Sequence, residues 1–575
     1  MQDHITYWNV LKGNPDIVQT LRREFKCSEV IANVLATRGF TSKENTKDFF
    51  QPDLTCLHDP YLMKDMNCAV ERILENIKSN VPILVFGDYD VDGTTGTALL
   101  YIALKKIGGI VHTYIPNREK EGYGLSKDGI LHAKNTGANL LITCDCGINA
   151  NEQIQFAAEN GIDVIVTDHH MPDDDNLPDA LAILNPKQRA CNYPFKGLCG
   201  CGVAFKLAVA LIKALGISLE EIYPLLELVT LGTIADMMPI LDENRVIVSA
   251  GLRRMEFTKN LGLRHLLEQS GLGGKSPSVV QLVFGVAPKI NAAGRLGDAN
   301  RSVTLLTTED DSVAMEHADV LFSENNLRKD IQNSVVEEAL RMVNASVNLK
   351  KDRAIILPGH GWHPGVVGIV ASKIKEEFHR PAIVISIDEN GVGKGSARSI
   401  PGFDLYTALT KTSEYLEGYG GHPMAAGLTV LESKLDAFRQ AFVTYASKIL
   451  KEKDLIPTIT LDGEMKLKDI NTRFMNFLDK LAPYGPGNMR PKFAVRGVDV
   501  VGNPRIIGNG NHLRFRVRQR QTTFDAIGFN MSHYYEKLIK GFPVDLAFVV
   551  ELNEWQGQSN LQLNIRDIKL TGREK

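Results

Sequence analysis

The chain has 575 residues, of which 44% are apolar, 23% charged and 7% aromatic, a composition typical of globular proteins and unlike that of disordered or fibrous chains. Lys plus Arg number 65 and Asp plus Glu number 68, so the formal charge of −3 gives no overall basic field of the kind that marks many nucleic-acid-binding proteins. The length predicts about three or four domains, and the lack of a signal-like N-terminus or a run of about 20 apolar residues predicts a cytoplasmic protein without a membrane segment.

The first 170 residues change from short helices to a strand–helix alternation. Short helices are expected within residues 17–50. Strands are then predicted at 81–90, 110–117, 139–147 and 162–170, with a helix between each pair. Each strand is a continuous apolar run, as expected for parallel strands that are buried on both faces. We therefore predict an α/β fold with a doubly wound parallel sheet.

The remainder of the chain changes character three times. Residues 202–345 are mainly helical, and 311–347 contain no Pro or Gly, which predicts one long helix connecting two lobes. A second, smaller α/β pattern follows, and after residue 490 short β-type stretches with turn residues predict a small sandwich or barrel. The predicted segments are 1–50, 51–310, 311–347, 348–455 and 456–575.

Acidic and imidazole side chains follow several of the apolar runs. They are Asp88, Asp90 and Asp92 after the first strand, Asp145 after the third, Asp168, His169 and His170 after the fourth, and Asp236 after a later run. Because sites in open α/β sheets form beyond the carboxyl ends of the strands, we expect these groups to converge. Asp88, Asp90 and Asp92 alternate along the chain, and residues i and i+2 lie on the same side of an extended chain, roughly 6–7 Å apart.

Burying such like charges together without a cation is costly, and oxygen-rich sites with one or two imidazoles suit Mn²⁺ or Mg²⁺. Two ions about 3.5–4 Å apart can activate water and stabilise an in-line phosphoryl displacement. Taken singly, each acid has a structural alternative as a helix or turn cap, and the histidine pair has one as core or surface residues. The pairs Cys144/Cys146 and Cys199/Cys201 have C-x-C spacing, which favours buried thiols over zinc ligands.

The segments "DYDVDG" (88–93), "CDCGIN" (144–149), "TDHH" (167–170) and "GTIADMMP" (232–239) resemble, in order and spacing, the four phosphoesterase motifs of the DHH superfamily, and most closely those of its RecJ family. Similar segments recur along most of residues 50–575: "PNREKEGYGLS" (116–126), "NAAGRLGDA" (291–299), "GWHPGVVGIVASKI" (361–374), "GSARSI" (395–400), "GGHPMAAG" (420–427) and "PYGPGNMRPKF" (483–493). The resemblance implies a DHH domain at 51–310, a connecting helix, a DHH-associated substrate-binding domain at 348–455 and an OB-fold at 456–575.

The resemblance also implies a centre for two ions, Mn²⁺ or Mg²⁺. Its ligands would be Asp90, Asp92, Asp145, His169 and Asp236, with Asp145 bridging the ions. Asp88 and His170 would line the site and orient ligands or water. The sequence departs from the commoner family form at Cys144 and Cys146, where valine and asparagine more often flank the aspartate.

Substrate contacts are implied in the same way. Arg118, Ser396 and Arg398 look like the family's grip on a 5′-terminal phosphate, which arginine forks suit; the alternative for Arg398 is an interdomain ion pair. Asn291 and Arg295 would contact phosphate or a base. His363 and His422 lie in glycine-rich turns, where the backbone can approach a ligand or simply form a turn.

The implied activity is that of a single-stranded-DNA-specific 5′–3′ exonuclease, which releases mononucleotides by two-metal-ion hydrolysis in DNA recombination and repair. A single-strand-binding protein and a helicase are candidate partners, and we expect a monomer. Two alternatives remain: a DHH phosphodiesterase acting on short oligonucleotides, and a catalytically inactive single-strand-binding replication scaffold.

In "HLRFRVRQR" (512–520), arginines alternate with Phe515 and Val517, which suits either an OB surface that tracks single strands or a solvated strand.

Overall fold

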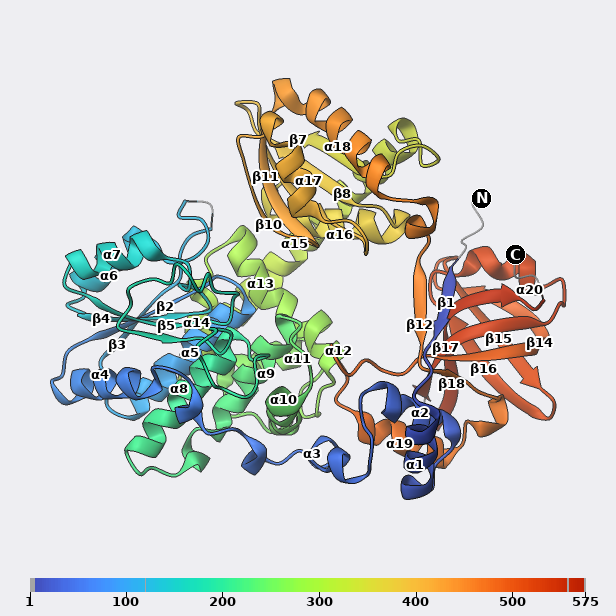
Figure 1. The fold of residues 1–575 in the computed structure, drawn as a ribbon, viewed down its shortest axis with the longest axis horizontal. Helices are drawn as coiled ribbons and strands as arrows, with labels where there is room; N and C mark the ends of the chain where they lie inside the picture. The colour runs from blue at the N-terminus through green and yellow to red at the C-terminus, as the bar shows by residue number, and fades with distance from the viewer. Residues whose placement is uncertain (1–5, 119, 556–557, 573–575) are drawn as a thin grey trace. The chain divides into compact units, whose positions relative to one another are not determined.

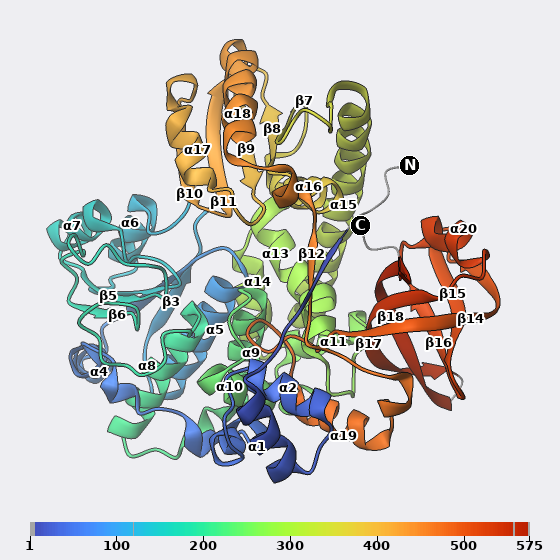
Figure 2. The ribbon, with the colours of Figure 1, turned by 45° about the vertical axis from the view of Figure 1, so that its right-hand side comes forward.

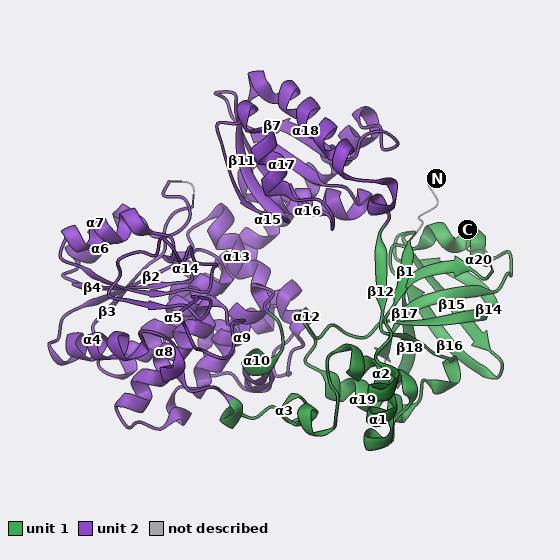
Figure 3. Cartoon of the chain, in the orientation of Figure 1, with its two compact units in different colours: residues 1–56, 239–245, 457–575 green, residues 57–238, 246–456 purple. Residues whose placement is uncertain are grey.

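The structure of the protein, a computed structural model, describes residues 6–118, 120–555 and 558–572. The chain forms two compact units (Figure 3). The first contains Met1–Cys56, Pro239–Arg245 and Pro457–Lys575, and the second contains Leu57–Met238 and Val246–Ile456. Among the described residues, no helix combines the length and the apolar character that crossing a membrane requires.

A five-stranded parallel sheet forms the first half of the second unit. Its order is β3 (Val111–Tyr114), β2 (Ile83–Gly87), β4 (Leu140–Cys144), β5 (Asp163–Thr167) and β6 (Ala182–Leu184), and every neighbouring pair is parallel. Helices lie on both faces (Figure 1): α6 (Lys127–Asn135) and α7 (Asn151–Glu159) on one, and α4 (Met66–Lys78), α5 (Val91–Lys106) and α8 (Gly200–Ala214) on the other. All of β2 and β4 is therefore buried, and the predicted doubly wound sheet is confirmed.

The strands are shorter than predicted at the ends where the acids lie. Strand β2 ends at Gly87, and α5 begins at Val91 because the Asp90 side chain accepts a hydrogen bond from the Gly93 N–H (3.0 Å) and caps the helix. The acids at 88, 90 and 92 thus lie on a strand-to-helix turn, and the expectation that they alternate along an extended chain was wrong.

The rest of the second unit is helical and then mixed. Helix α15 (Asp311–Ser346) confirms the long predicted helix. A second sheet has the order β10 (Gly418–His422), β11 (Ala425–Leu431), β9 (Val392–Arg398), β8 (Ala382–Ile387) and β7 (Ile355–His360), in which only β7 and β8 are parallel. Helix α16 (Pro364–Phe378) packs on this sheet through a core that includes Val366, Val370 and Val384.

The first unit is built around a β-barrel. Strands β14 (Phe493–Ile507), β15 (His512–Gln519), β16 (Thr522–Gly528), β18 (Gln558–Leu570) and β17 (Val544–Trp555) pair in that order, and β14 also pairs with β17 and closes the barrel. Strand β1 (Tyr7–Val10) runs beside β12 (Thr458–Leu461) in a parallel ribbon (Figure 2). The N-terminal helices α1 (Pro15–Phe25) and α2 (Glu29–Thr37) share the barrel's hydrophobic core.

The alternation predicted along β15 is confirmed. Phe515 and Val517 are buried, whereas the three arginines at 514, 516 and 518 are exposed. Asp525 lies 2.9 Å from Arg516 and 3.7 Å from Arg514, so part of this basic face is neutralised within the barrel.

Candidate active site

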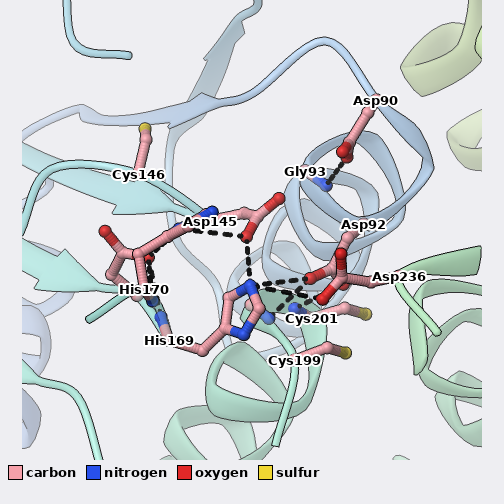
Figure 4. A network of polar contacts seen from close by, with 12 residues as sticks. Asp90, Asp92, Gly93, Asp145, Cys146, His169, His170, Cys199, Cys201 and Asp236 are labelled. Atoms are coloured by element: carbon pink, nitrogen blue, oxygen red, sulfur yellow. Dashed lines mark hydrogen bonds and ion pairs between the residues drawn. The ribbon is translucent and has the colours of Figure 1, made fainter. Parts of the chain in front are cut away.

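The polar residues converge at the carboxyl edge of the parallel sheet, as predicted. Strands β2, β4 and β5 are neighbours, and hydrogen bonds continue beyond them: the Asp88 N–H donates to the Cys144 carbonyl (3.3 Å) and the Asp145 N–H donates to the Thr167 carbonyl (3.0 Å). Figure 4 shows the resulting network, in which Asp145, Asp92 and Asp236 face the His169 ring.

Asp92 is held by the N-terminus of α8. Its Oδ2 accepts a hydrogen bond from the Gly200 N–H (2.6 Å) and its Oδ1 accepts one from the Cys201 N–H (2.9 Å). A helix N-terminus carries partial positive charge, which favours the ionised carboxylate. Asp92 is 1% exposed, and these two bonds fix the orientation of its carboxylate inside the protein.

His169 faces three carboxylates at once. Its Nε2 lies 3.1 Å from Asp145 Oδ1, 3.5 Å from Asp236 Oδ2 and 3.9 Å from Asp92 Oδ2. Burial lowers the pKa of His169 to about 4 despite these charges, so the imidazole is neutral at pH 7. A neutral imidazole among carboxylates is a competent metal ligand.

Asp168, which the sequence placed among the converging groups but for which it predicted no role in the site, organises the histidine pair. Its Oδ1 lies 2.8 Å from His170 Nδ1 and its Oδ2 accepts a hydrogen bond from the Ile148 N–H (3.0 Å). Burial raises the pKa of Asp168, but the hydrogen bond and charge of the His170 side chain and the backbone N–H groups of His170 and Ile148 together outweigh burial and leave the pKa below its ordinary value. Burial likewise lowers the pKa of His170, yet Asp168 leaves it raised.

Tyr123 is a second residue that the sequence did not single out. Its hydroxyl lies 3.3 Å from His170 Nε2, and burial, followed by the charge of Asp145, raises its pKa, which keeps the phenol protonated. Tyr123 lies in "PNREKEGYGLS" (116–126), one of the segments that resemble the family, but no feature of that segment marked its tyrosine.

The donor set fits divalent cations. Three groups each bring their ligand atoms within 4.8 Å of one another: Asp88, Asp90 and Asp145; Asp92, His169 and Asp236; and Asp145, His169 and His170. These groups contain all seven of the residues predicted for the metal centre. The first two of these groups have no residue in common, so each could hold one ion.

Buried oxygens without donors support the same conclusion. Asp88 Oδ1 and Asp145 Oδ1 receive no hydrogen bond, because the 3.1 Å contact of Asp145 with His169 lacks the geometry of one. Burial, and then the charges of neighbouring carboxylates, raise the pKa of both acids well above the ordinary value. An unpaired buried carboxylate costs several kcal/mol, whereas a bound cation would satisfy these oxygens directly.

The cysteines at 144, 146, 199 and 201 are buried free thiols, as predicted. None belongs to a metal-suited group among the described residues. Cys199 caps α8, with its Sγ accepting a hydrogen bond from the Gly202 N–H (3.3 Å), and the Cys146 sulfur points away from the carboxylates (Figure 4).

A cavity of about 940 Å³ in the same unit gathers positive charge. Arg118, Arg295, Ser396 and Arg398 line it together with Tyr89. The Arg398 Nη1 donates to Ser396 Oγ (3.0 Å), and the Arg118 guanidinium lies 5.2 Å from the centre of the Tyr89 ring. Burial, followed by the charge of Arg118, lowers the pKa of Arg295 to about 10.

Across the described part of the chain, none of these three arginines forms an ion pair with a carboxylate, so the alternative of an interdomain ion pair for Arg398 is not observed. Guanidinium groups that have no carboxylate partner and lie beside a hydroxyl make a site for an anion such as phosphate; Arg295 and Arg398 are half-buried and Arg118 is exposed.

The remaining predicted substrate residues lie elsewhere. Asn291 is half-buried on α13 (Ala287–Leu296) and does not line the cavity. His363 Nδ1 accepts a hydrogen bond from the Gly365 N–H (3.0 Å) and caps α16, which is a structural role. His422 is exposed and lines a separate cavity of about 300 Å³, which also contains Tyr123 and His170.

Gly200 offers a direct test of the metal centre. A Cβ at this position would lie 2.5 Å from Asp145 Cβ and 2.7 Å from its Cα, so Gly200→Ala must displace Asp145 or the end of α8 that holds Asp92. We expect Mn²⁺ affinity, measured by calorimetry, to fall by about 10- to 100-fold. Gly202→Ala is the matched control, because its Cβ would meet the Leu198 side chain at an ordinary 3.4 Å. Equal affinities in the two variants would contradict the proposed packing.

The pH dependence of metal binding is a second test. Burial, followed by the charge of Asp92, raises the pKa of Asp236 to about 7. Below that pH the metal-free protein keeps a proton on Asp236, and a cation must displace it. We therefore expect Mn²⁺ to bind roughly tenfold more weakly at pH 6 than at pH 8, with about one proton released near pH 6. Calorimetry in buffers of different ionisation enthalpy measures both quantities; a constant affinity without proton release would show that Asp236 does not bind the ion.

Known families match three parts of the chain. The DHH family, N-terminal domain, matches residues 82–233, the DHHA1 domain matches 351–448, and the RecJ OB domain matches 461–567. The single-stranded-DNA-specific exonuclease RecJ of Bacillus subtilis is 38% identical over 97% of this chain and 70% of its own length. That of Dickeya dadantii is 35% identical over 94% of this chain and 96% of its own length.

Solved structures agree with the sequence matches. The crystal structure of Thermus thermophilus RecJ in complex with Mn²⁺ matches with a TM-score of 0.83 and 30% identity, covering 100% of this chain and 81% of that one. The Mg²⁺ complex of the same protein matches with a TM-score of 0.77 and 28% identity. With the acid–histidine centre, the parallel sheet and the closed barrel described above, these matches show that the chain belongs to the RecJ exonuclease family.

Proposed function

We propose that the protein is a metal-dependent exonuclease that removes mononucleotides from the 5′ end of single-stranded DNA. The observation that carries the proposal is the position of Tyr89. This residue lines the arginine-rich cavity, and its two neighbours in the chain, Asp88 and Asp90, belong to the acid cluster. A site for a terminal phosphate and a site for metal ions therefore flank one residue, which suits cleavage one nucleotide from the end.

The proposed ligands of two ions, Mn²⁺ or Mg²⁺, are Asp90, Asp92, Asp145, His169 and Asp236. When bound, the ions supply Lewis-acid neutralisation of the phosphate and a more acidic water. Asp145 belongs to two of the three metal-suited groups, which supports a bridging role. The α8 N-terminus holds the Asp92 carboxylate, and Asp168 holds His170 beside Tyr123, so these groups would orient the ligands.

The cavity would hold the 5′-terminal phosphate through Arg118, Ser396 and Arg398. The hydrogen bond from Arg398 to Ser396 aligns two phosphate-binding groups before substrate arrives, which reduces the entropy lost on binding. Arg295 adds positive charge, and its Nη1 donates to the Gly365 carbonyl (3.0 Å), which fixes the guanidinium. We assign no specific contact to Asn291, His363 or His422.

Single-stranded DNA is the proposed partner of the whole chain. We assign hydrolysis to residues 51–310, recognition of the 5′ end to 348–455 and guidance of the strand to 456–575, where Arg518 is the β15 arginine with no ion pair among the described residues. Work in recombination and repair would place a monomer in the cytoplasm, with a single-strand-binding protein and a helicase supplying the substrate. The complete acid cluster argues against an inactive scaffold, and the barrel argues against an enzyme limited to short oligonucleotides.

The activity is tested with a labelled single strand, with Mn²⁺ or Mg²⁺, and with Asp145→Ala as the inactive reference. We expect mononucleotides to appear from the 5′ end only with metal, and the variant to be slower by at least about 10³-fold, since the residue belongs to two metal-suited groups. Duplex DNA of the same sequence is the control substrate. Tight binding of the strand without cleavage under any metal would contradict the proposal and favour a scaffold.

The end-recognition cavity is tested with Arg398→Ala on strands that carry a 5′-phosphate or a 5′-hydroxyl. Loss of a charged hydrogen bond to phosphate should lower kcat/KM for the phosphorylated strand by about 10- to 100-fold and leave the hydroxyl strand nearly unchanged. Lys411→Ala, an exposed lysine of the same lobe outside this cavity, is the matched control. An equal loss on both strands would show that Arg398 does not read the terminal phosphate.

A further inference from the structure

The chain leaves the second unit immediately after the proposed ligand Asp236. Helix α9 (Leu226–Ala235) ends there, Met237 adopts a left-handed conformation (φ 57°), and the Met238 N–H donates back to the Thr233 carbonyl (3.0 Å). The next seven residues, Pro239–Arg245, belong to the first unit. We call them the hook segment; only two residues separate it from Asp236.

Two glycines of the first unit receive the start of the hook segment. The Ile240 N–H donates to the Pro486 carbonyl (2.7 Å). A Cβ on Gly485 would lie 2.5 Å from Ile240 Cγ1, and one on Gly487, whose φ is +73°, would lie 3.0 Å from Leu241 Cδ1. Glycine is therefore required at both positions for the segment to pack this closely.

Arg245 is the last residue of the hook segment. It is 2% exposed, and its guanidinium donates to five backbone carbonyls, which are those of Phe49 (2.6 Å), Lys480 (3.4 Å), Leu481 (3.1 Å), Ala482 (2.8 Å) and Pro483 (3.3 Å). It also lies 3.7 Å from the centre of the Phe49 ring. No carboxylate among the described residues pairs with it, so the charge is satisfied by carbonyl dipoles, and the bonds tie the hook segment to two distant parts of the first unit.

The neighbouring acids differ in how their side chains are held, and Asp88 and Asp145 each keep one oxygen without a donor. Asp90 and Asp92 each accept a backbone N–H, and Asp168 accepts several. The Asp236 carboxylate accepts no hydrogen bond from any described residue, and among those residues its one ion-pair contact is with His169 Nε2 at 3.5 Å. Its position therefore depends on the backbone on either side, which is α9 before it and the hook segment after it.

We infer that Arg245 is a positioning residue for the metal centre, which acts by anchoring the hook segment that follows Asp236. Loss of the anchor frees the backbone after Asp236, and a ligand without a hydrogen bond of its own then binds the ion less well. The acids at 88, 90 and 145, which lie on strand ends far from the hook segment in the chain, keep their geometry. The inference rests on the proposed function only in taking Asp236 as a ligand.

The test measures Mn²⁺ binding to the full chain without DNA, by calorimetry and by electron paramagnetic resonance, in Arg245→Ala and Arg245→Lys. We expect one of two binding events to weaken by about tenfold and the other to stay unchanged, with the lysine variant intermediate. Gly487→Ala, which disturbs the receiving glycine without touching Arg245, should produce the same selective loss and replaces Arg245→Ala if that variant does not fold.

Arg380→Ala is the matched control. Arg380 also donates to three backbone carbonyls, those of Leu349, Asp352 and Phe378, but lies in the second sheet domain far along the chain from Asp236. It should lower the thermal stability and leave both Mn²⁺ affinities unchanged. Unchanged Mn²⁺ affinities in the folded hook variants, or an equal weakening of both events, would overturn the inference. Because the readout is metal binding, failure of the wild-type protein to cleave DNA would contradict the proposed function and not this inference.

Discussion

Repulsion between buried carboxylates is the constraint on which the site depends. The parallel sheet brings acids from three neighbouring strand ends into one small volume, where burial and mutual charge oppose their ionisation. The protein compensates only part of this charge. It gives the N-terminus of α8 to Asp92 and His170 to Asp168, and leaves Asp88 and Asp145 with oxygens that meet no donor. Divalent cations would compensate the negative charge that remains on these oxygens.

The same unit carries an excess of positive charge in its large cavity. Arginines gather in a cavity without carboxylate partners among the described residues, so their charge is available to an anion. A polymer end with a terminal phosphate and a scissile phosphate complements both imbalances at once, whereas a neutral ligand complements neither. Electrostatic preorganisation of this kind stabilises charge that develops during phosphoryl transfer without further rearrangement.

Much of the fold follows from local patterns in the sequence. Continuous apolar runs such as Ile83–Phe86 specified buried parallel strands, and a run without Pro or Gly specified α15. Convergence of the acids that follow β2, β4 and β5 was predicted because they end parallel strands, whereas Asp236 follows helix α9. The conformation of Asp88–Asp92 could not be predicted, because period-two spacing fits both an extended strand and a capped helix start, and the bond from Gly93 to Asp90 decides between them.

Contacts between distant residues were beyond the reach of those patterns. The bonds from Gly200 and Cys201 to Asp92 join positions more than a hundred residues apart, and no periodicity encodes them. No role in the site was predicted for Asp168, because its role depends on His170 folding back on it. The composition of the first unit could not be predicted from local patterns either, because this unit joins the N-terminal segment, seven residues from the middle of the chain and the C-terminal barrel.

The most direct test of this account is anomalous diffraction at the manganese edge from crystals grown with Mn²⁺. The account predicts two peaks about 3.5–4 Å apart, one among Asp92, His169 and Asp236 and one among Asp88, Asp90 and Asp145. Crystals with saturating Mn²⁺ that show no peak among these residues would contradict the claim that cations balance the buried carboxylates.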